Sequence, residues 1–227
     1  MAPDLRDTYL RDMVRTFRNY KTLAERAMAQ VSDADLHTLI DPESNSLAVV
    51  VKHVAGNLRS RFTDFLTADG EKPNRDRDSE FEMPASASRA VIMEWWESGW
   101  SVATASIEAL TPEDLDRTVY IRGEAFQVVE ALNRSVTHTA YHVGQIVLLA
   151  RHFAGAGWKS LSIPKGQSAK FTRDDFKTRG LADGPALGQA LALAEDAWLA
   201  ADFPLGKPEL AAIADHSAAC LAGDRQP

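Results

Sequence analysis

Residues 125–153 read AFQVVEALNRSVTHTAYHVGQIVLLARHF. In this stretch the apolar residues recur every three or four positions, which is the spacing of an amphipathic helix. They are Val128, Val129, Leu132, Val136, Val143, Ile146, Val147 and Leu149. Two glycines, Gly155 and Gly157, follow shortly and are typical of a helix end. The stretch therefore predicts one long helix whose apolar stripe needs other helices to cover it.

Three earlier segments show the same helical period. They cover residues 3–31, a segment from about residue 46 to just before Asp69, and residues 87–110. Between the second and third lies a charged stretch interrupted by proline, which predicts a long connection over residues 70–88. A small hairpin is expected around Arg122-Gly123, ahead of the long helix.

Four long helices joined by three connections predict an all-α fold, an up-down four-helix bundle. We expect residues 1–171 to form this bundle domain. Residues 172–227 are rich in alanine and predict a helical C-terminal extension of unknown role, with helices over about 185–201 and 208–222. Nothing in the periodicity supports a β-rich fold.

The composition is that of a soluble globular protein, with 227 residues of which 45% are hydrophobic and 25% charged. The formal net charge of -7 argues against a nucleic-acid partner, whose binding surface would be basic. A single cysteine, Cys220, excludes a disulfide framework and any multi-cysteine metal site within one chain. No apolar run has the roughly 18 residues of a membrane span, and the N-terminus lacks a secretion signal, so we expect a cytoplasmic protein without a membrane partner.

Three histidines carry the strongest chemical signal in the chain. His138 and His142 are four residues apart in the long helix, which puts both imidazoles on one helix face. His53 lies beside inward-facing valines of the second helix and also faces inward. A shared metal ion would satisfy one nitrogen on each ring, and three histidines with an open fourth position match a catalytic zinc site. The alternative is that each ring is a core histidine hydrogen-bonded to its surroundings.

Three long blocks of the sequence resemble a known superfamily. They are NSLAVVVKHVAGNLRSRFTDFLTADGEKPNRDRDSEF at 45–81, SVTHTAYHVGQIVLLARH at 135–152 and WKSLSIPKGQSAKF at 158–171. Together they resemble the DinB-like superfamily of YfiT-type metalloenzymes, specifically an uncharacterised bacterial subfamily, over about residues 3–171. The resemblance implies a four-helix bundle that holds a divalent metal, zinc or nickel, through His53, His138 and His142.

The resemblance also implies an activity, because characterised relatives are thiol-dependent S-transferases that use mycothiol, bacillithiol or glutathione. We therefore expect a metal-dependent enzyme that delivers a low-molecular-weight thiol to an electrophile, since a cation lowers the pKa of a thiol bound to it. The same cation would activate water, so a metal-dependent hydrolase is the alternative. A second alternative is a non-enzymatic metal-binding or stress-linked interaction protein. No acidic residue lies one turn from any of the three histidines, which favours the transferase. A carboxylate from the first or third helix, such as Asp12, Glu94 or Glu97, could still reach the site and serve a hydrolase.

Four more residues are candidates for orienting the ligands or binding a small-molecule substrate: Asn57, Tyr141, Gln145 and Arg77. Arg77, Asp78 and Glu80 in the long connection could cover the site or clamp an anionic substrate. The alternative for Asn57 and Gln145 is a partly exposed helix edge, for Tyr141 a helix face that points at a neighbouring helix, and for the charged connection an ordinary solvated surface. No catalytic residue is assigned. The resemblance and a cluster of tryptophans at residues 95–100 indicate a homodimer.

Overall fold

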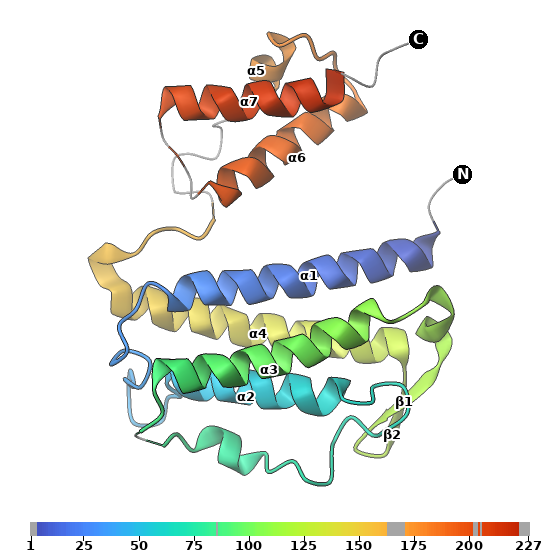
Figure 1. Ribbon diagram of the computed structural model, residues 1–227, viewed down its shortest axis with the longest axis vertical. Coiled ribbons are helices and arrows are strands. Elements are labelled where there is room, and N and C mark those ends of the chain that lie inside the picture. Colours follow the sequence, from blue (N-terminus) through green and yellow to red (C-terminus); the bar gives the residue numbers. More distant parts are fainter. Residues whose placement is uncertain (1–3, 85, 163–170, 202–203, 205, 223–227) are drawn as a thin grey trace. The chain divides into compact units, whose positions relative to one another are not determined.

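The computed structural model describes residues 4–84, 86–162, 171–201, 204 and 206–222, and it is mostly helical, as expected for an all-α protein (Figure 1). The chain divides into two compact units, residues 1–159 and 160–227. The predicted domain boundary after residue 171 stays a prediction, because residues 163–170 of the third quoted block lie outside the described residues. No helix in the described part of the chain combines the length and the apolar character needed to cross a membrane.

Four long helices build the N-terminal unit. They are α1 (Leu5–Met28), α2 (Leu47–Phe62), α3 (Arg89–Glu108) and α4 (Val128–Ala154). Side chains at the ends decide where three of them begin: Asp4, Ser46 and Ser88 each accept a hydrogen bond from a backbone N–H of the first turn. A short hairpin, β1 (Thr118–Ile121) and β2 (Glu124–Gln127), precedes α4.

Two helix bounds differ from the sequence-based expectation. The second helix ends at Phe62 and does not reach Asp69, because Thr63 is extended and Asp64 takes a positive φ of 48°. Phe65 still packs on Phe62, with ring centroids 5.1 Å apart. The apolar residues of this segment therefore remain in contact beyond the end of the helix. The fourth helix begins at Val128, three residues after its expected start at residue 125, because the preceding residues form β2 and pair with β1.

The predicted hairpin is present around its two-residue turn. Arg122 and Gly123 both have positive φ, 57° and 76°. Two positive φ values at the centre of a hairpin turn match the right-handed twist of the strands that it joins. Glycine at the second position adopts this backbone without strain.

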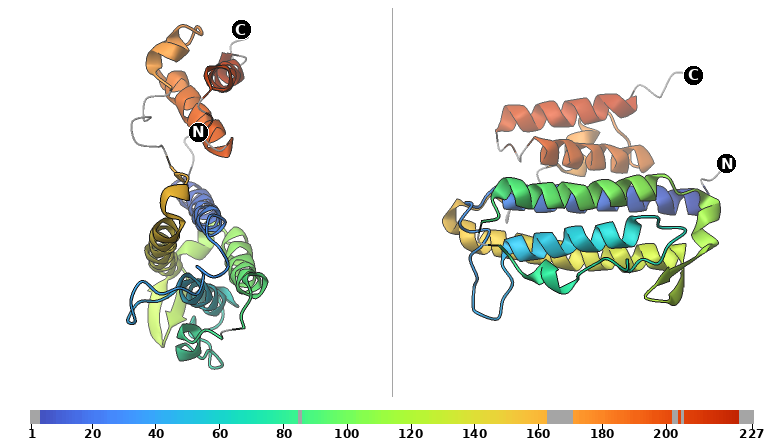
Figure 2. Two further views of the ribbon diagram at one scale, coloured as in Figure 1. Left: turned by 90° about the vertical axis from the view of Figure 1, so that its left-hand side faces the viewer. Right: turned by 60° about the horizontal axis from the view of Figure 1, so that its bottom comes forward.

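The helices do not alternate in direction, so the simple up-down order expected from the sequence is wrong. Along α2 and α3 the contacts advance together, from Lys52 over the Trp95 ring to the Ser106 hydroxyl on the Phe62 carbonyl, so these helices run parallel (Figures 1 and 2). The connection between them returns the chain along the length of α2. Its predicted length is therefore needed to reach the start of α3.

Aromatic rings fill the centre of the N-terminal unit. Phe17 of α1 meets the rings of Phe62 and Trp100 edge-on, and Trp96 packs on Trp100. All four side chains are almost fully buried. The Trp96 indole donates to the Glu25 carboxylate at 3.1 Å, which satisfies its N–H inside the core.

The C-terminal unit has a core of its own. It contains α5 (Arg173–Lys177), α6 (Pro185–Ala200) and α7 (Lys207–Ala222), and the last two match the helices expected there. Phe176 and Leu187 pack with four buried alanines of α6 and α7, whose small side chains let the helices approach closely.

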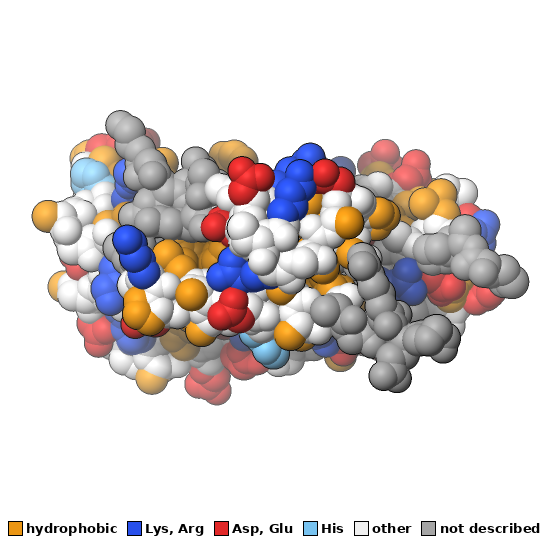
Figure 3. Space-filling model, turned by 90° about the horizontal axis from the view of Figure 1, so that it is seen from above, with side chains coloured by type: hydrophobic (Ala, Val, Ile, Leu, Met, Phe, Trp, Pro, Cys, Tyr) orange, Lys and Arg blue, Asp and Glu red, His pale blue; other side chains and the backbone are white. Residues whose placement is uncertain are grey.

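On the face of the molecule shown in Figure 3, acidic and basic side chains are mixed with apolar ones.

Gly99 sets the approach of α3 to α2 and gives a direct test of this packing. A Cβ at Gly99 would lie 2.5 Å from the backbone oxygen of Ala55, whereas a Cβ at Gly144 of α4 would meet nothing within 4 Å. We expect Gly99→Ala to lower the free energy of unfolding by about 1–3 kcal/mol. Gly144→Ala, the matched control, should raise it by about 0.5–1 kcal/mol. Chemical denaturation measures both, and equal effects of the two substitutions would contradict the packing described.

Candidate metal centre

The three predicted ligands come together where α2 packs against α4. One ligand nitrogen from each of His53, His138 and His142 lies within 4.8 Å of the other two, and the group could hold a metal ion. The Nε2 atoms of His53 and His138 are 3.4 Å apart. Tetrahedral bonds of 2.0–2.1 Å would place ligand nitrogens about 3.4 Å from one another. The rings stand at 65–70° to one another, so their edges, and not their faces, meet.

Hydrogen bonds prepare two of the rings as metal ligands. The Nδ1 of His53 lies 2.8 Å from the Glu80 carboxylate, and the Nδ1 of His142 lies 2.7 Å from the amide oxygen of Gln145. Because both partner oxygens are acceptors, each Nδ1 carries the proton and donates it. The lone pair of each Nε2 is then free for a cation, which is the arrangement typical of metal-binding histidines.

Protonation states also favour metal binding. Burial, helped by the charges of His142 and His53, lowers the pKa of His138 to about 3. Burial likewise lowers the pKa of His142, although the hydrogen bond with Gln145 opposes this shift. Both rings are therefore neutral near pH 7, and neutral imidazole is the form that binds metals. The nitrogen donor set, its convergence and its protonation all fit a divalent metal.

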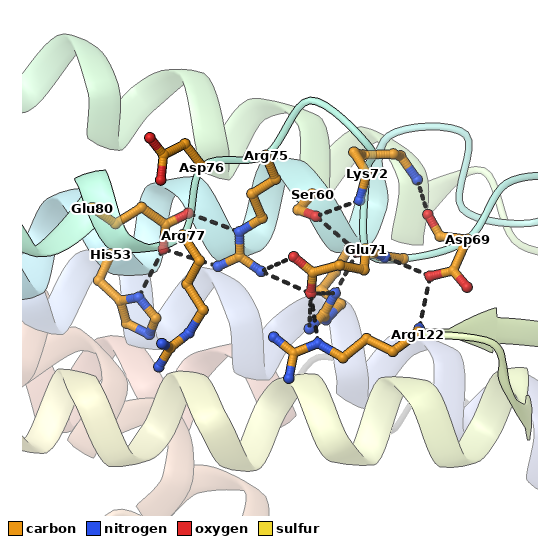
Figure 4. Close-up of polar contacts among 12 residues, drawn as sticks. His53, Ser60, Asp69, Glu71, Lys72, Arg75, Asp76, Arg77, Glu80 and Arg122 are labelled. Carbon is orange, nitrogen blue, oxygen red and sulfur yellow. Dashed lines mark hydrogen bonds and ion pairs between the residues drawn. The ribbon is translucent and has the colours of Figure 1, made fainter.

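Glu80 is the residue that fixes His53, and it is itself buried. Arg75 holds the carboxylate with two hydrogen bonds, from Nε at 2.8 Å and from Nη2 at 2.9 Å (Figure 4). Burial raises the pKa of Glu80, but the hydrogen bonds from His53 and Arg75 and the charge of Arg75 outweigh it and leave the pKa lowered. Glu80 is thus a buried, ionised acceptor.

Two features of α2 let the connection bring Glu80 this close. Gly56 has no side chain, and a Cβ there would overlap the Glu80 carboxyl group. The Lys52 ammonium donates to the backbone carbonyls of Ser79 and Glu82, on both sides of Glu80, at 2.6 and 2.8 Å. The connection is therefore bound to α2 by its backbone as well as by its acid.

A second ion cluster continues from Arg75 away from the histidines. Glu71 accepts from Arg75, from Arg61 of α2 and from Arg122 of the hairpin turn (Figure 4). Asp69 accepts from the backbone N–H groups of Arg122 and Gly123 at 2.8 and 2.7 Å. Together these bonds tie the start of the connection to the hairpin.

A cavity of about 480 Å³ opens beside His53 and His138, and we call it the site cavity. Three of the candidate residues lie on its wall: Asn57, Arg77 and Tyr141. The fourth, Gln145, contacts His142 as described above. Their chemical roles stay predictions. Asp78 is different, because its side chain is 95% exposed and points to solvent, so the structure does not bring it to the site.

Sequence reasoning missed the part that Glu80 plays. It looked for acids one turn from each histidine, and Glu80 follows His53 by 27 residues in a stretch without any period. It considered Glu80 only as part of a cover or clamp over the site, and it did not consider Arg75 or Glu71 at all. One signal was present, since Gly56 lies almost one turn after His53 and leaves room for a group from outside the helix.

The comparisons with known proteins give one result. A family model described as "Protein of unknown function (DUF1572)" matches residues 4–167, which include all three histidines. No curated protein and no solved structure gives a significant match.

The orientation of His53 by Glu80 predicts a specific loss of metal affinity. Glu80→Gln keeps the size of the side chain but replaces the ionised acceptor with a weaker, neutral one. We expect zinc affinity, measured by competition with a chromophoric chelator, to fall by about 10- to 100-fold. Glu82→Gln removes an exposed acid two residues away and should leave the affinity unchanged. Equal affinities of the two variants would show that Glu80 does not act on the site.

Proposed function

The chain belongs to DUF1572, a DinB-like family of unknown function, and we propose that it is a metal-dependent transferase that delivers a low-molecular-weight thiol to an electrophile. The observation that supports this most is the combination of three convergent histidine nitrogens with a cavity at their side. We also propose that the N-terminal unit is a four-helix bundle of the DinB-like kind.

His53, His138 and His142 would hold the metal, and imidazole is a suitable ligand for both zinc and nickel. A divalent cation bound there supplies positive charge that lowers the pKa of a thiol and yields a thiolate at neutral pH. The protein's own contribution is orientation. Glu80 and Gln145 keep the Nδ1 protons of His53 and His142 in place, so that the Nε2 lone pairs of these two rings are available to the metal. In the transfer, the new carbon–sulfur bond replaces the bond to the leaving group, and the thiol proton passes to solvent.

The hydrolase alternative lacks a general base. No acidic side chain of the described residues lines the site cavity. Glu80 contacts His53, but both of its oxygens are bound by His53 and Arg75, and its lowered pKa makes it a weak base. A thiolate needs no such base, because it is already the nucleophile. A purely structural metal is disfavoured by the cavity, since structural sites are closed.

The remaining features of the proposal come from the sequence alone. They are a small-molecule substrate without nucleic-acid or membrane partners, a homodimer, and a bacterial cytoplasmic location. The role of residues 172–227 is open.

The proposed function is tested with protein purified without a nickel column and then loaded with zinc. Conjugation of monochlorobimane to a panel of thiols, including glutathione, cysteine and bacillithiol, is followed by fluorescence. The reaction forms a carbon–sulfur bond and releases chloride. We expect turnover with at least one thiol, and a loss of about 100-fold or more in His142→Ala, because two imidazoles bind a metal weakly.

His152→Ala is the matched control, because His152 is exposed in the last turn of the same helix and outside the cluster. It should keep both the zinc content and the turnover of the wild type. Conjugation rates that are the same with and without a chelator, for every thiol, would overturn the proposal.

A further inference from the structure

The wall of the site cavity is unusually rich in positive charge. Five of the residues that line it are arginines: Arg61, Arg75, Arg77, Arg122 and Arg134. The whole chain has a net charge of -7, so this concentration runs against its overall balance. None of the acids in the described ranges lines the same cavity. A cavity with these walls attracts anions and repels cations.

Three of the five arginines have close acidic partners. Arg61 and Arg122 both contact the Glu71 carboxylate, at 3.2 and 2.9 Å. Arg75 is shared between Glu71 and Glu80. These interactions hold the connection and the hairpin in place, so these three guanidinium groups serve the structure of the cavity wall. Two carboxylates do not balance five guanidinium groups, and positive charge is left over.

The excess charge lies on Arg77 and Arg134. Arg77 has only a loose ion pair, 3.9 Å from the highly exposed Asp78, and its guanidinium stacks over the Phe81 ring. Phe81 in turn packs on His53, and Figure 4 shows the Arg77 side chain extending past His53 towards α4.

Arg134 lies on α4, one turn before His138. It stacks over the Phe126 ring and forms no ion pair with the described residues. The two arginines thus approach the cavity from different elements, one from the connection and one from α4.

We infer that the site cavity binds an anionic group, a carboxylate or a phosphate, of the small molecule that enters the metal site, and that Arg77 and Arg134 bind this group. The inference rests on the proposed function, because it names the class of its substrate. A guanidinium group keeps its charge at any physiological pH and offers paired N–H donors that match both anions. Stacking on Phe81 and Phe126 orders the two side chains before the ligand arrives.

The size of the cavity supports a small molecule. Sites for small ligands typically measure about 300–1,000 Å³, and the site cavity, at about 480 Å³, falls in this range. The Tyr141 side chain and the amide of Asn57 add neutral polar groups to the wall. The cavity can therefore hold an anionic group beside the histidines, with the reacting end of the molecule at the metal.

The test measures binding of two thiol-free anions, succinate and inorganic phosphate, by isothermal titration calorimetry. Succinate reports on a carboxylate and inorganic phosphate on a phosphate group. Zinc-loaded wild type is compared with Arg77→Gln and Arg134→Gln, whose side chains are partly or fully exposed, so both variants should fold. We expect each substitution to weaken binding about tenfold, because each removes a hydrogen-bonded charge. Arg11→Gln changes an exposed arginine of α1 outside the cavity and should bind as the wild type does.

The same titrations on His142→Ala separate this inference from the proposed function. Binding that persists in this variant and is still weakened by Arg77→Gln supports the arginines as the anion site, even if no thiol is turned over. Binding of one anion only supports the inference and identifies the group. No binding of either anion to the wild type, or equal affinities of the wild type and both arginine variants, would overturn it.

Discussion

The hydrogen bond between the Nδ1 of His53 and the Glu80 carboxylate is the interaction on which the site depends. It joins His53 of α2, a candidate metal ligand, to a residue from the long connection, and it decides which nitrogen of the ring is free. Both side chains are more than 90% buried, so the charge of Glu80 has to be compensated inside the protein. Arg75 supplies this compensation, and Glu71 in turn forms ion pairs with Arg75 and two further arginines.

The connection between α2 and α3 explains why these groups lie together. Because α2 and α3 run parallel, the chain has to return along α2 before α3 begins (Figure 1). This return path places residues 71–81 along α2, where Glu80 supplies a hydrogen-bond partner for His53, Glu71 forms an ion cluster, and Arg75 and Arg77 line one side of the cavity. The length of the connection is thus a property of the site as well as of the fold.

The sequence was sufficient for features that depend on short spacing. The helical period found the four long helices, the four-residue spacing of His138 and His142 placed both rings on one face, and Arg122-Gly123 marked the hairpin. It failed for features that depend on a single local backbone conformation or on a long-range contact. The end of α2 at Phe62 depends on one backbone angle at Asp64, and the partnership of Glu80 with His53 depends on the path of an aperiodic segment. Neither leaves a repeating pattern in the sequence.

The central claim is that His53, His138 and His142 together hold one divalent metal. X-ray absorption spectroscopy at the zinc edge, on protein loaded with one equivalent of zinc, tests it most directly. We expect imidazole scattering from three histidines, with zinc–nitrogen distances of about 2.0–2.1 Å and a light scatterer in the remaining position. A shell dominated by water or carboxylate oxygen, with one imidazole or none, would show that the three histidines do not hold the zinc.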